Sequence, residues 1–417
     1  MTEDMSVLAF YKKVYYGWWI VLACFLIAAY VSGGVSLNFT AFFQPVVAEF
    51  GWSYTKVSLV STIRGFEIGI FAFFAGFLVD RFGPRQLVAF GFTTISLGLL
   101  LFSRTSSLLG FFGAFVLMSL GAGGCTSVVL TAVLANWFQQ NLGKALGIMA
   151  CGFGAGGLLV PIVVRLIDVL TWRTTAMVLG IGALVIGLPL SLVIRNRPGP
   201  SDRAPEGLEY VPPNGGKRPP NHARPAAFWP AVRSRNFWYF NAAEAVRMLI
   251  LNAVMMHVMP YLATQGFDRT RAGLVTAAIP LVSIIGRFGF GWLGDTLDKR
   301  RVLFSTHVLM GLGMLAFALV RVPGLLVPFL FCFSVGYGGS MPLRGLILRE
   351  YFGLAALGSL LGVSMGLAAT GGMIGPVLAG YVYDATGSYL PVWLGSFVLT
   401  LFSSAMILLL QKNPQSG

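Results

Sequence analysis

The chain contains two related stretches, Gly76-Phe-Leu-Val-Asp80-Arg81-Phe-Gly-Pro-Arg85 and Gly291-Trp-Leu-Gly-Asp295-Thr-Leu-Asp-Lys-Arg300. The matching glycine, acid and arginine of the two stretches lie 215 residues apart. Two further blocks keep the same offset, 119–125 with 334–340 and Gly147 with Gly362. A spacing held by three separate blocks indicates an internal duplication. In a membrane protein such a repeat predicts two bundles that meet around a central site.

Composition places the chain in a lipid bilayer. Of its 417 residues, 56% are hydrophobic and only 11% are charged, which is too apolar a balance for a soluble protein of this size. About 20 apolar residues span a membrane, and twelve stretches of that kind follow one another along the chain. The expected spans are 17–45, 54–79, 86–104, 108–137, 144–168, 173–195, 236–263, 270–294, 301–320, 322–348, 358–383 and 387–411.

The segment 196–235 separates six of these spans from the other six. It combines proline, glycine and charge with few apolar residues, which is typical of a flexible linker. We therefore expect an all-α membrane protein of twelve transmembrane helices in two pseudo-symmetric six-helix bundles. The expected domains are the N-terminal bundle 1–195, the cytoplasmic linker 196–235 and the C-terminal bundle 236–417.

The formal charge of +14 does not indicate a nucleic-acid partner. The basic residues follow alternate loops and do not gather in one patch, a distribution that the positive-inside rule explains. The positive-inside rule then predicts that the N- and C-termini are both cytoplasmic. The four cysteines, Cys24, Cys125, Cys151 and Cys332, all lie in apolar spans and show no metal-ligand spacing, so we expect no metal site, cofactor or disulfide framework.

The paired Gly-x-x-x-Asp-Arg-x-Gly-x-Arg loops and the twelve spans resemble the major facilitator superfamily over the whole chain. Tyr16-Gly17-Trp18-Trp19, Trp137-Phe138, His257 with Pro260, and Arg287 narrow the resemblance to the monocarboxylate transporter-like branch. The resemblance implies the major facilitator fold and alternating access. It also implies that Arg287, in the eighth span, binds the carboxylate of the substrate.

The chain departs from this family pattern at two positions. Well-studied animal members carry an acid one turn before the arginine and a lysine in the first helix, both linked to proton coupling. Here those positions hold Ser283 and Leu37. Bacterial relatives that exchange oxalate for formate add a lysine in the eleventh helix, and the span 358–383 has none.

Charged side chains inside a membrane span are costly, so each is a candidate functional group. Arg287 lies near mid-membrane, and the nearest acid in its own helix is Asp295, roughly 12 Å along. Its planar guanidinium matches a carboxylate. By contrast, Arg165 and Arg344 are expected near an interface, where their long side chains reach the headgroups.

Arg64 with Glu67 and Glu244 with Arg247 form i,i+3 pairs of opposite charge. They are read either as structural ion pairs or as sites where Glu67 or Glu244 takes up a proton. His257 is the third proton-coupling candidate, with an ordinary interfacial histidine as the alternative.

Further substrate-binding candidates are polar residues inside the spans. Tyr337 stands where the first half has Ala122, which makes the repeat asymmetric at that point. The complete set comprises Arg287, Ser283, Tyr337, Asn38, Tyr30 and Asn252. A second set lies at the cytoplasmic helix ends and is expected to control the conformational change, with no contact to substrate; it comprises Asp80, Arg81, Arg85, Asp295 and Arg300.

We expect a multi-pass transporter, working as a monomer in a bacterial cytoplasmic (inner) membrane, that moves small monocarboxylates such as lactate or pyruvate together with protons. The alternative is proton-independent organic-anion exchange, or antiport of dicarboxylates of the oxalate/formate type with Arg64 or Arg247 as a second cation. A receptor or sensor would need a sensory domain that the linker and tail lack. An enzyme is not expected, since no catalytic triad, metal cluster or phosphate loop stands in a suitable context.

Overall fold

In the computed structural model of the chain, the described residues are 15–37, 39–52, 71, 74–196, 198, 223–320 and 323–411, and among them every regular element is a helix. Eleven helices are long and apolar enough to cross a membrane. They confirm eleven of the twelve expected spans and the all-α membrane class. The remaining expected span, 54–79, lies mostly outside the described residues.

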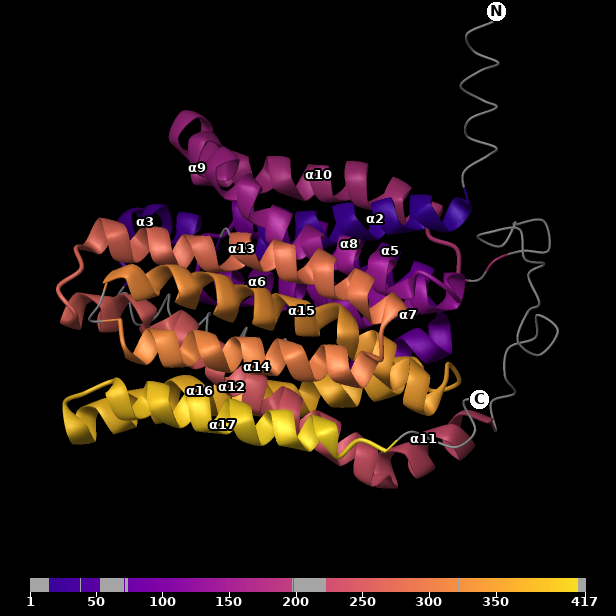
Figure 1. The fold of residues 1–417 in the computed structure, drawn as a ribbon. Coiled ribbons are helices and arrows are strands. Elements are labelled where there is room, and N and C mark those ends of the chain that lie inside the picture. The colour runs from indigo at the N-terminus through magenta and orange to yellow at the C-terminus, as the bar shows by residue number, and fades with distance from the viewer. Residues whose placement is uncertain are drawn as a thin grey trace, which may run out of the picture. The chain divides into compact units, whose positions relative to one another are not determined.

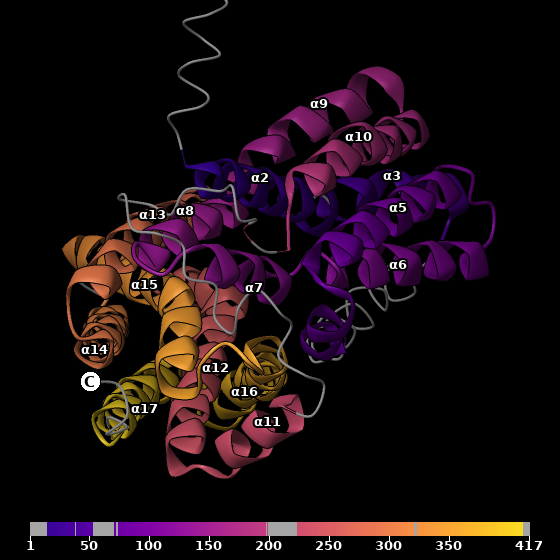
Figure 2. The same ribbon diagram turned by 90° about the vertical axis from the view of Figure 1, so that its right-hand side faces the viewer.

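The chain divides into two compact units. The first holds Met1–Arg64 and Leu78–Pro225, and the second holds Gly65–Phe77 and Ala226–Gly417. Figures 1 and 2 show the helices coloured along the chain, from indigo at the N-terminus to yellow at the C-terminus, so that α12 to α17 of the second unit run from pink to yellow.

The first unit is built from helices whose ends follow local sequence signals. α5 begins after Gly83, whose φ of 86° suits glycine, with Pro84 at its first position. Ser107 caps α6 by accepting a hydrogen bond from the Gly110 amide at 3.2 Å. α5 packs between α10 and α6 (Figure 2). The helices are α2 (Tyr16–Tyr30), α3 (Phe39–Phe50), α5 (Pro84–Ser103), α6 (Leu108–Gly123), α7 (Ser127–Trp137), α8 (Leu142–Ala155), α9 (Leu159–Leu170) and α10 (Trp172–Val193).

The first membrane helix changes its winding where it meets α8. α2 continues as a π-helical turn, η1 (Val31–Leu37), and α8 continues as a 3₁₀ turn, η2 (Gly156–Leu158). A Cβ on Gly33 would lie 2.2 Å from the Gly156 carbonyl oxygen, and one on Gly152 would lie 2.3 Å from the Phe25 oxygen. Glycine is therefore required at these crossings, where small residues let helix backbones approach closely in lipid.

An exposed ion pair joins the end of α3 to the first residues of α10. Glu49 accepts hydrogen bonds from the Arg173 Nη2 at 2.7 Å and from the Trp172 indole at 2.6 Å. The hydrogen bond from Arg173, followed by that from Trp172, holds the pKa of the Glu49 carboxyl below its usual value against the opposing effect of desolvation. Because the pair is solvent-exposed, it contributes little to the free energy of unfolding.

The helices of the second unit also begin at local sequence signals, and three of them start with a polar capping residue. Ser234, Asp268 and Asp298 each accept a hydrogen bond from an amide in the first turn of the helix that follows. α12 packs on α16, α15 packs on both α13 and α14, and α17 lies along α14 and α12 (Figures 1 and 2). The helices are α11 (Ala223–Arg233), α12 (Arg235–Thr264), α13 (Arg269–Thr296), α14 (Lys299–Ala318), α15 (Leu326–Phe352), α16 (Leu357–Thr386) and α17 (Leu390–Leu408).

Glycines bring the backbones of α12 and α16 into contact. A Cβ on Gly371 would lie 2.1 Å from the Ala245 carbonyl oxygen, and one on Gly375 would lie 2.0 Å from that of Leu249. α13 and α15 meet in the same way, since a Cβ on Gly286 would lie 2.1 Å from the Val335 oxygen. These contacts fix the backbone beside the charged residues of α12 and α13.

We expect Gly375→Ala to destabilise the protein even though alanine favours a helix by roughly 1 kcal/mol. The added methyl must displace the Leu249 backbone, and overpacking of this kind costs about 1–3 kcal/mol. Gly395→Ala, on the exposed face of α17, is the matched control because nothing lies within 4 Å of its Cβ. Thermal unfolding in detergent, followed by size-exclusion fluorescence, should show a lower midpoint for the first variant only. Equal midpoints would refute the close contact.

Candidate functional site

Arg287 lies on α13 with its side chain directed at α15. It is 5% exposed, and its Nη2 donates a hydrogen bond of 3.0 Å to the Tyr337 hydroxyl. The guanidinium carbon also lies 5.8 Å from the centre of the Tyr337 ring. Ser283, one turn earlier on α13, is fully buried and donates to the Pro280 carbonyl at 2.6 Å. The structure thus brings Arg287, Tyr337 and Ser283 together, as three of the predicted binding residues.

The close contact of α13 and α15 is what places these side chains. A Cβ on Gly338, next to Tyr337, would lie 2.3 Å from the Ser283 carbonyl oxygen. At the position where the two halves of the repeat differ, the chain therefore has Tyr337, whose phenol contacts Arg287. The next residue, Gly338, lets α13 approach α15 closely. A guanidinium buried beside a phenol offers an anion both charge and a second hydrogen-bonding group.

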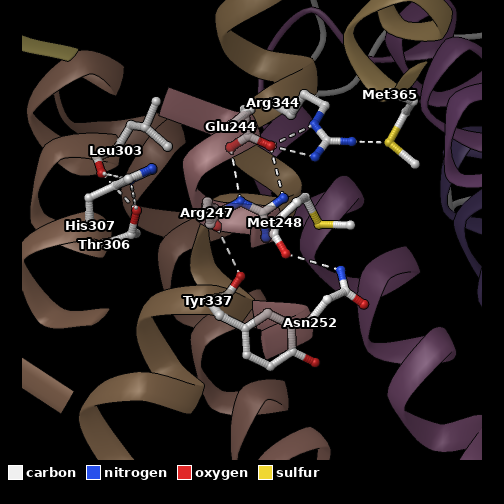
Figure 3. A network of polar contacts seen from close by, with 11 residues as sticks. Glu244, Arg247, Met248, Asn252, Leu303, Thr306, His307, Tyr337, Arg344 and Met365 are labelled. Atoms are coloured by element: carbon white, nitrogen blue, oxygen red, sulfur yellow. Dashed lines mark hydrogen bonds and ion pairs between the residues drawn. The ribbon is translucent and has the colours of Figure 1, made fainter. Parts of the chain in front are cut away.

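A second cluster of charge lies in the same unit, at the carboxylate of Glu244 on α12. Arg247 donates from Nε to Oε1 at 3.1 Å and from Nη2 to Oε2 at 2.8 Å. Arg344, on α15, donates from Nε to Oε2 at 3.1 Å and from Nη2 to the same oxygen. Figure 3 shows the two guanidinium groups on the one carboxylate. The i,i+3 pair that the sequence predicts is confirmed as an ion pair, and it gains a second arginine.

This cluster is buried and its charges do not balance. Glu244, Arg247 and Arg344 are 0%, 4% and 7% exposed. In their ionised forms two cations share one anion, which leaves a net charge of +1. No second carboxylate forms an ion pair with the cluster in the part of the chain that the structure describes. The remaining Arg344 nitrogen, Nη1, is directed at the Met365 thioether, which is a weak acceptor.

The expectation that Arg344 reaches toward an interface is wrong. It rested on the position of Arg344, about 20 residues into the expected span 322–348. In the structure the guanidinium is 7% exposed and forms an ion pair with Glu244 inside the bundle. The carboxylate that holds it there belongs to α12, a hundred residues earlier in the chain. Arg165, by contrast, is exposed on α9.

His307, on α14, is a buried ionisable residue that the sequence analysis missed. It is 1% exposed, and its Nδ1 lies 3.1 Å from the Leu303 carbonyl oxygen and 3.4 Å from the Thr306 hydroxyl. Electrostatic interaction links it to Glu244 and Arg247, and Figure 3 shows it beside the cluster. Its position within the apolar span 301–320 was the signal that would have identified it.

The predicted candidate His257 has both ring nitrogens in hydrogen bonds. Nε2 lies 2.9 Å from the Pro376 carbonyl oxygen and Nδ1 lies 3.1 Å from the Tyr389 hydroxyl. Because a carbonyl only accepts, Nε2 carries the proton and Nδ1 accepts from the tyrosine. This arrangement satisfies a neutral imidazole completely.

The lesser binding candidates are held by backbone carbonyls. Asn252 donates to the Met248 carbonyl at 3.0 Å, and the hydroxyl of Tyr30, in the first unit, donates to the Leu179 carbonyl. Asn38, Arg64 and Glu67 lie outside the described residues, so their predicted roles stay predictions.

The residues predicted to control the conformational change lie at helix ends. The Arg85 amide donates to the Asn196 side chain at 3.1 Å, and Arg81 lies 5.3 Å from the Phe82 ring centre. Arg300 donates to the Leu410 carbonyl at 2.7 Å, which ties α14 to the end of α17. Asp80 and Asp295 also make polar or electrostatic contacts, Asp295 with Arg349.

The unequal charge of the cluster predicts unequal effects of substitution. Glu244→Gln keeps the shape but raises the net charge from +1 to +2, whereas Arg344→Gln leaves a neutral Glu244–Arg247 pair. We expect Glu244→Gln to lower stability by about 3–5 kcal/mol, as breaking a buried pair does, and Arg344→Gln to lower it less. Thermal unfolding of the two purified variants in one detergent checks the order, and the reverse order would contradict the charge count.

The chain is similar to known transporters over most of its length. It is 27% identical to Monocarboxylate transporter 13 of Bos taurus, over 92% of this chain and 87% of that protein. It is 25% identical to the MFS-type transporter YcxA of Bacillus subtilis (strain 168), over 89% and 90%. The crystal structure of the E. coli fucose:proton symporter FucP matches with a TM-score of 0.73 at 15% identity, over 96% of this chain and all of that one, and this likeness supports the fold.

The family profile for the Major Facilitator Superfamily matches residues 22–268 and 248–417, which together cover nearly the whole chain. The match agrees with the helical architecture and with relatives that are named transporters. This multi-pass membrane protein therefore belongs to the Major Facilitator Superfamily of transporters.

Proposed function

We propose that the chain is a secondary active transporter of small monocarboxylates, of the lactate and pyruvate kind, coupled to protons, in which Arg287 binds the carboxylate. The observation that carries the proposal is a guanidinium buried inside the second unit and oriented by the Tyr337 phenol. The similarity to a monocarboxylate transporter supports the substrate class.

The geometry around Arg287 suits a small anion with one carboxylate. A guanidinium offers two parallel N–H groups to the two carboxylate oxygens, and in a buried setting such a pair is strong. The Tyr337 hydroxyl accepts from Arg287, so its own proton is available for a second oxygen, such as the keto or hydroxyl oxygen of the substrate. Charge selects for anions, and the phenol adds selectivity for a neighbouring polar group.

The transport cycle follows from two units built on the same repeat. We place the substrate near mid-membrane and infer that the units alternate access to it, with Asp80, Arg81, Arg85, Asp295 and Arg300 controlling the helix ends. The proposed setting is a bacterial cytoplasmic membrane, with the protein active as a monomer and both termini cytoplasmic.

Replacing Arg287 tests the binding role. Arg287→Ala removes both the charge and the two parallel N–H groups of the guanidinium. We expect uptake of labelled lactate into proteoliposomes to fall at least about 100-fold, equivalent to roughly 2.7 kcal/mol. Arg287→Lys keeps only the charge, and we expect a loss of at least about tenfold. The matched control is Arg165→Ala, an exposed arginine on α9, which should transport normally. Near wild-type uptake by well-expressed Arg287→Ala would remove Arg287 from the site.

The net charge of the Glu244 cluster favours a second candidate function. The cluster at Glu244 carries a net positive charge, and a second cation in the same unit suits a dicarboxylate or exchange of organic anions without protons. The absence of an acid at Ser283 agrees with that alternative.

Uptake of lactate, pyruvate and oxalate separates the two functions. Wild-type proteoliposomes should accumulate the monocarboxylates when an inward proton gradient is imposed and should lose that accumulation when the gradient is collapsed. Oxalate should compete weakly, because one carboxylate would stay without a partner at Arg287. Strong oxalate exchange that is indifferent to the gradient would support the dicarboxylate antiporter.

A further inference from the structure

α11 lies inside the segment 196–235 that the sequence predicts to be a linker, and it has little contact with other helices. It has eleven residues, Ala223–Arg233, and none of the described helices packs extensively against it. The Phe228 ring contacts the Phe77 ring, with 5.6 Å between ring centres, within the second unit. A helix of this length is marginal in water without packing, and Pro230 removes one of its hydrogen bonds. A surface that covers α11 would stabilise it.

A fixed corner at Ser234 joins α11 to α12 (Figure 2). The Ser234 hydroxyl accepts a hydrogen bond from the Phe237 amide at 3.2 Å and donates to the Ala231 carbonyl at 2.7 Å. Beside the corner, the Asn236 side chain pairs with the Gln411 backbone through hydrogen bonds of 2.9 and 3.0 Å. The corner is therefore tied to the segment that follows α17.

Two tryptophans and two arginines are arranged symmetrically about this corner. Trp229 and Arg233 lie four residues apart on α11, so they share one face of that helix. Arg235 and Trp238 lie three residues apart on α12 and also share a face. All four side chains are exposed, and the two indoles are 57% and 52% exposed. Neither arginine forms an ion pair with any residue that the structure describes.

The length of α12 places the corner at the level of the lipid headgroups. α12 is a membrane span of 30 residues, Arg235–Thr264. It is about 45 Å long, whereas the hydrocarbon core of a bilayer is about 30 Å thick. The first turn of α12 therefore reaches the headgroup region. Tryptophan is enriched at this level because its ring is amphipathic, and a guanidinium offers two parallel N–H groups to a phosphate.

The charge around the corner suits an anionic lipid. Between residues 210 and 243 the sequence has no aspartate or glutamate, so no acid of this stretch repels an anion. A zwitterionic headgroup carries a phosphate but no net charge, and it would gain less from this stretch. The basic residues of the stretch are Lys217, Arg218, Arg224, Arg233 and Arg235.

We propose that the corner between α11 and α12, from Trp229 to Trp238, is a binding surface for anionic phospholipid. The two arginines bind the headgroup phosphate, and the two tryptophans lie at the boundary between headgroups and acyl chains. The indoles favour a lipid over a soluble phosphate, because an exposed apolar ring gains nothing from an inorganic anion. The inference goes beyond the proposed function and holds whichever anion is transported.

Binding of two short-chain lipids to the purified full chain in detergent, counted by native mass spectrometry, tests the surface. The probes are dioctanoyl-phosphatidylglycerol and dioctanoyl-phosphatidylcholine, and we expect the wild type to prefer the first. The double variant Arg233→Gln, Arg235→Gln should bind phosphatidylglycerol roughly 30-fold more weakly, since each arginine near an anionic headgroup contributes a factor of about five. Arg301→Gln, which changes an exposed arginine in the first turn of α14, is the matched control and should bind as the wild type does.

Three results would overturn the proposal. They are equal binding of the two lipids by the wild type, unchanged affinity of the double variant, and displacement of the lipid by an excess of inorganic phosphate. The last result would assign the arginines to a soluble anion. Equal thermal midpoints of the wild type and the variants check that the fold is kept, which we expect because the substituted side chains are exposed.

Tryptophan fluorescence gives a second measurement that leaves every charge in place. The difference in emission between the wild type and Trp229→Phe isolates Trp229, and Trp238→Phe isolates Trp238 in the same way. In vesicles of phosphatidylcholine and phosphatidylglycerol, we expect brominated phospholipid to quench both indoles and aqueous iodide to quench neither. Quenching by iodide alone would place the corner in water and refute the lipid surface.

Discussion

A carboxylate shared by two arginines inside a helix bundle is the interaction on which the chemistry of the second unit depends. Glu244 anchors Arg247 from its own helix and Arg344 from α15. Without it, two guanidinium groups would stand in a low-dielectric interior with no counter-charge, at a cost of several kcal/mol. With it, the unit keeps a single excess positive charge. That excess favours an anion in the same unit over a second cation.

Backbone contacts at glycine make this arrangement possible. Gly371 brings α16 against the backbone at Ala245, the residue after Glu244, and Gly338 brings α15 against Ser283, one turn before Arg287. Small residues at these crossings allow close packing where lipid supplies no hydrophobic force to press helices together. The same glycines leave little freedom for local adjustment. The charged side chains are therefore held on helices whose backbones contact one another directly.

The sequence predicted the architecture well because hydropathy and internal repetition act over the whole chain. Eleven expected spans appear as helices, although the first ends at Val35 where residue 45 was expected. The Arg287, Ser283 and Tyr337 positions lie together. The partner of Arg344 could not be predicted, because an ion pair between α12 and α15 depends on how two distant helices pack. The same packing makes His307 a neighbour of Glu244. Its apolar span offered a signal, but only the fold shows that it is buried beside the charged cluster.

The most direct test of the account uses ligands and leaves the protein unaltered. Lactate and lactamide have nearly the same size and share the hydroxyl group, but only lactate carries a charged carboxylate. Competition against labelled pyruvate on the purified wild-type protein measures what that charge contributes. If Arg287 binds the carboxylate, lactate displaces pyruvate and lactamide does not at concentrations about 100-fold higher, equivalent to roughly 2.7 kcal/mol. Equal displacement by the two ligands would contradict a site built on a buried guanidinium.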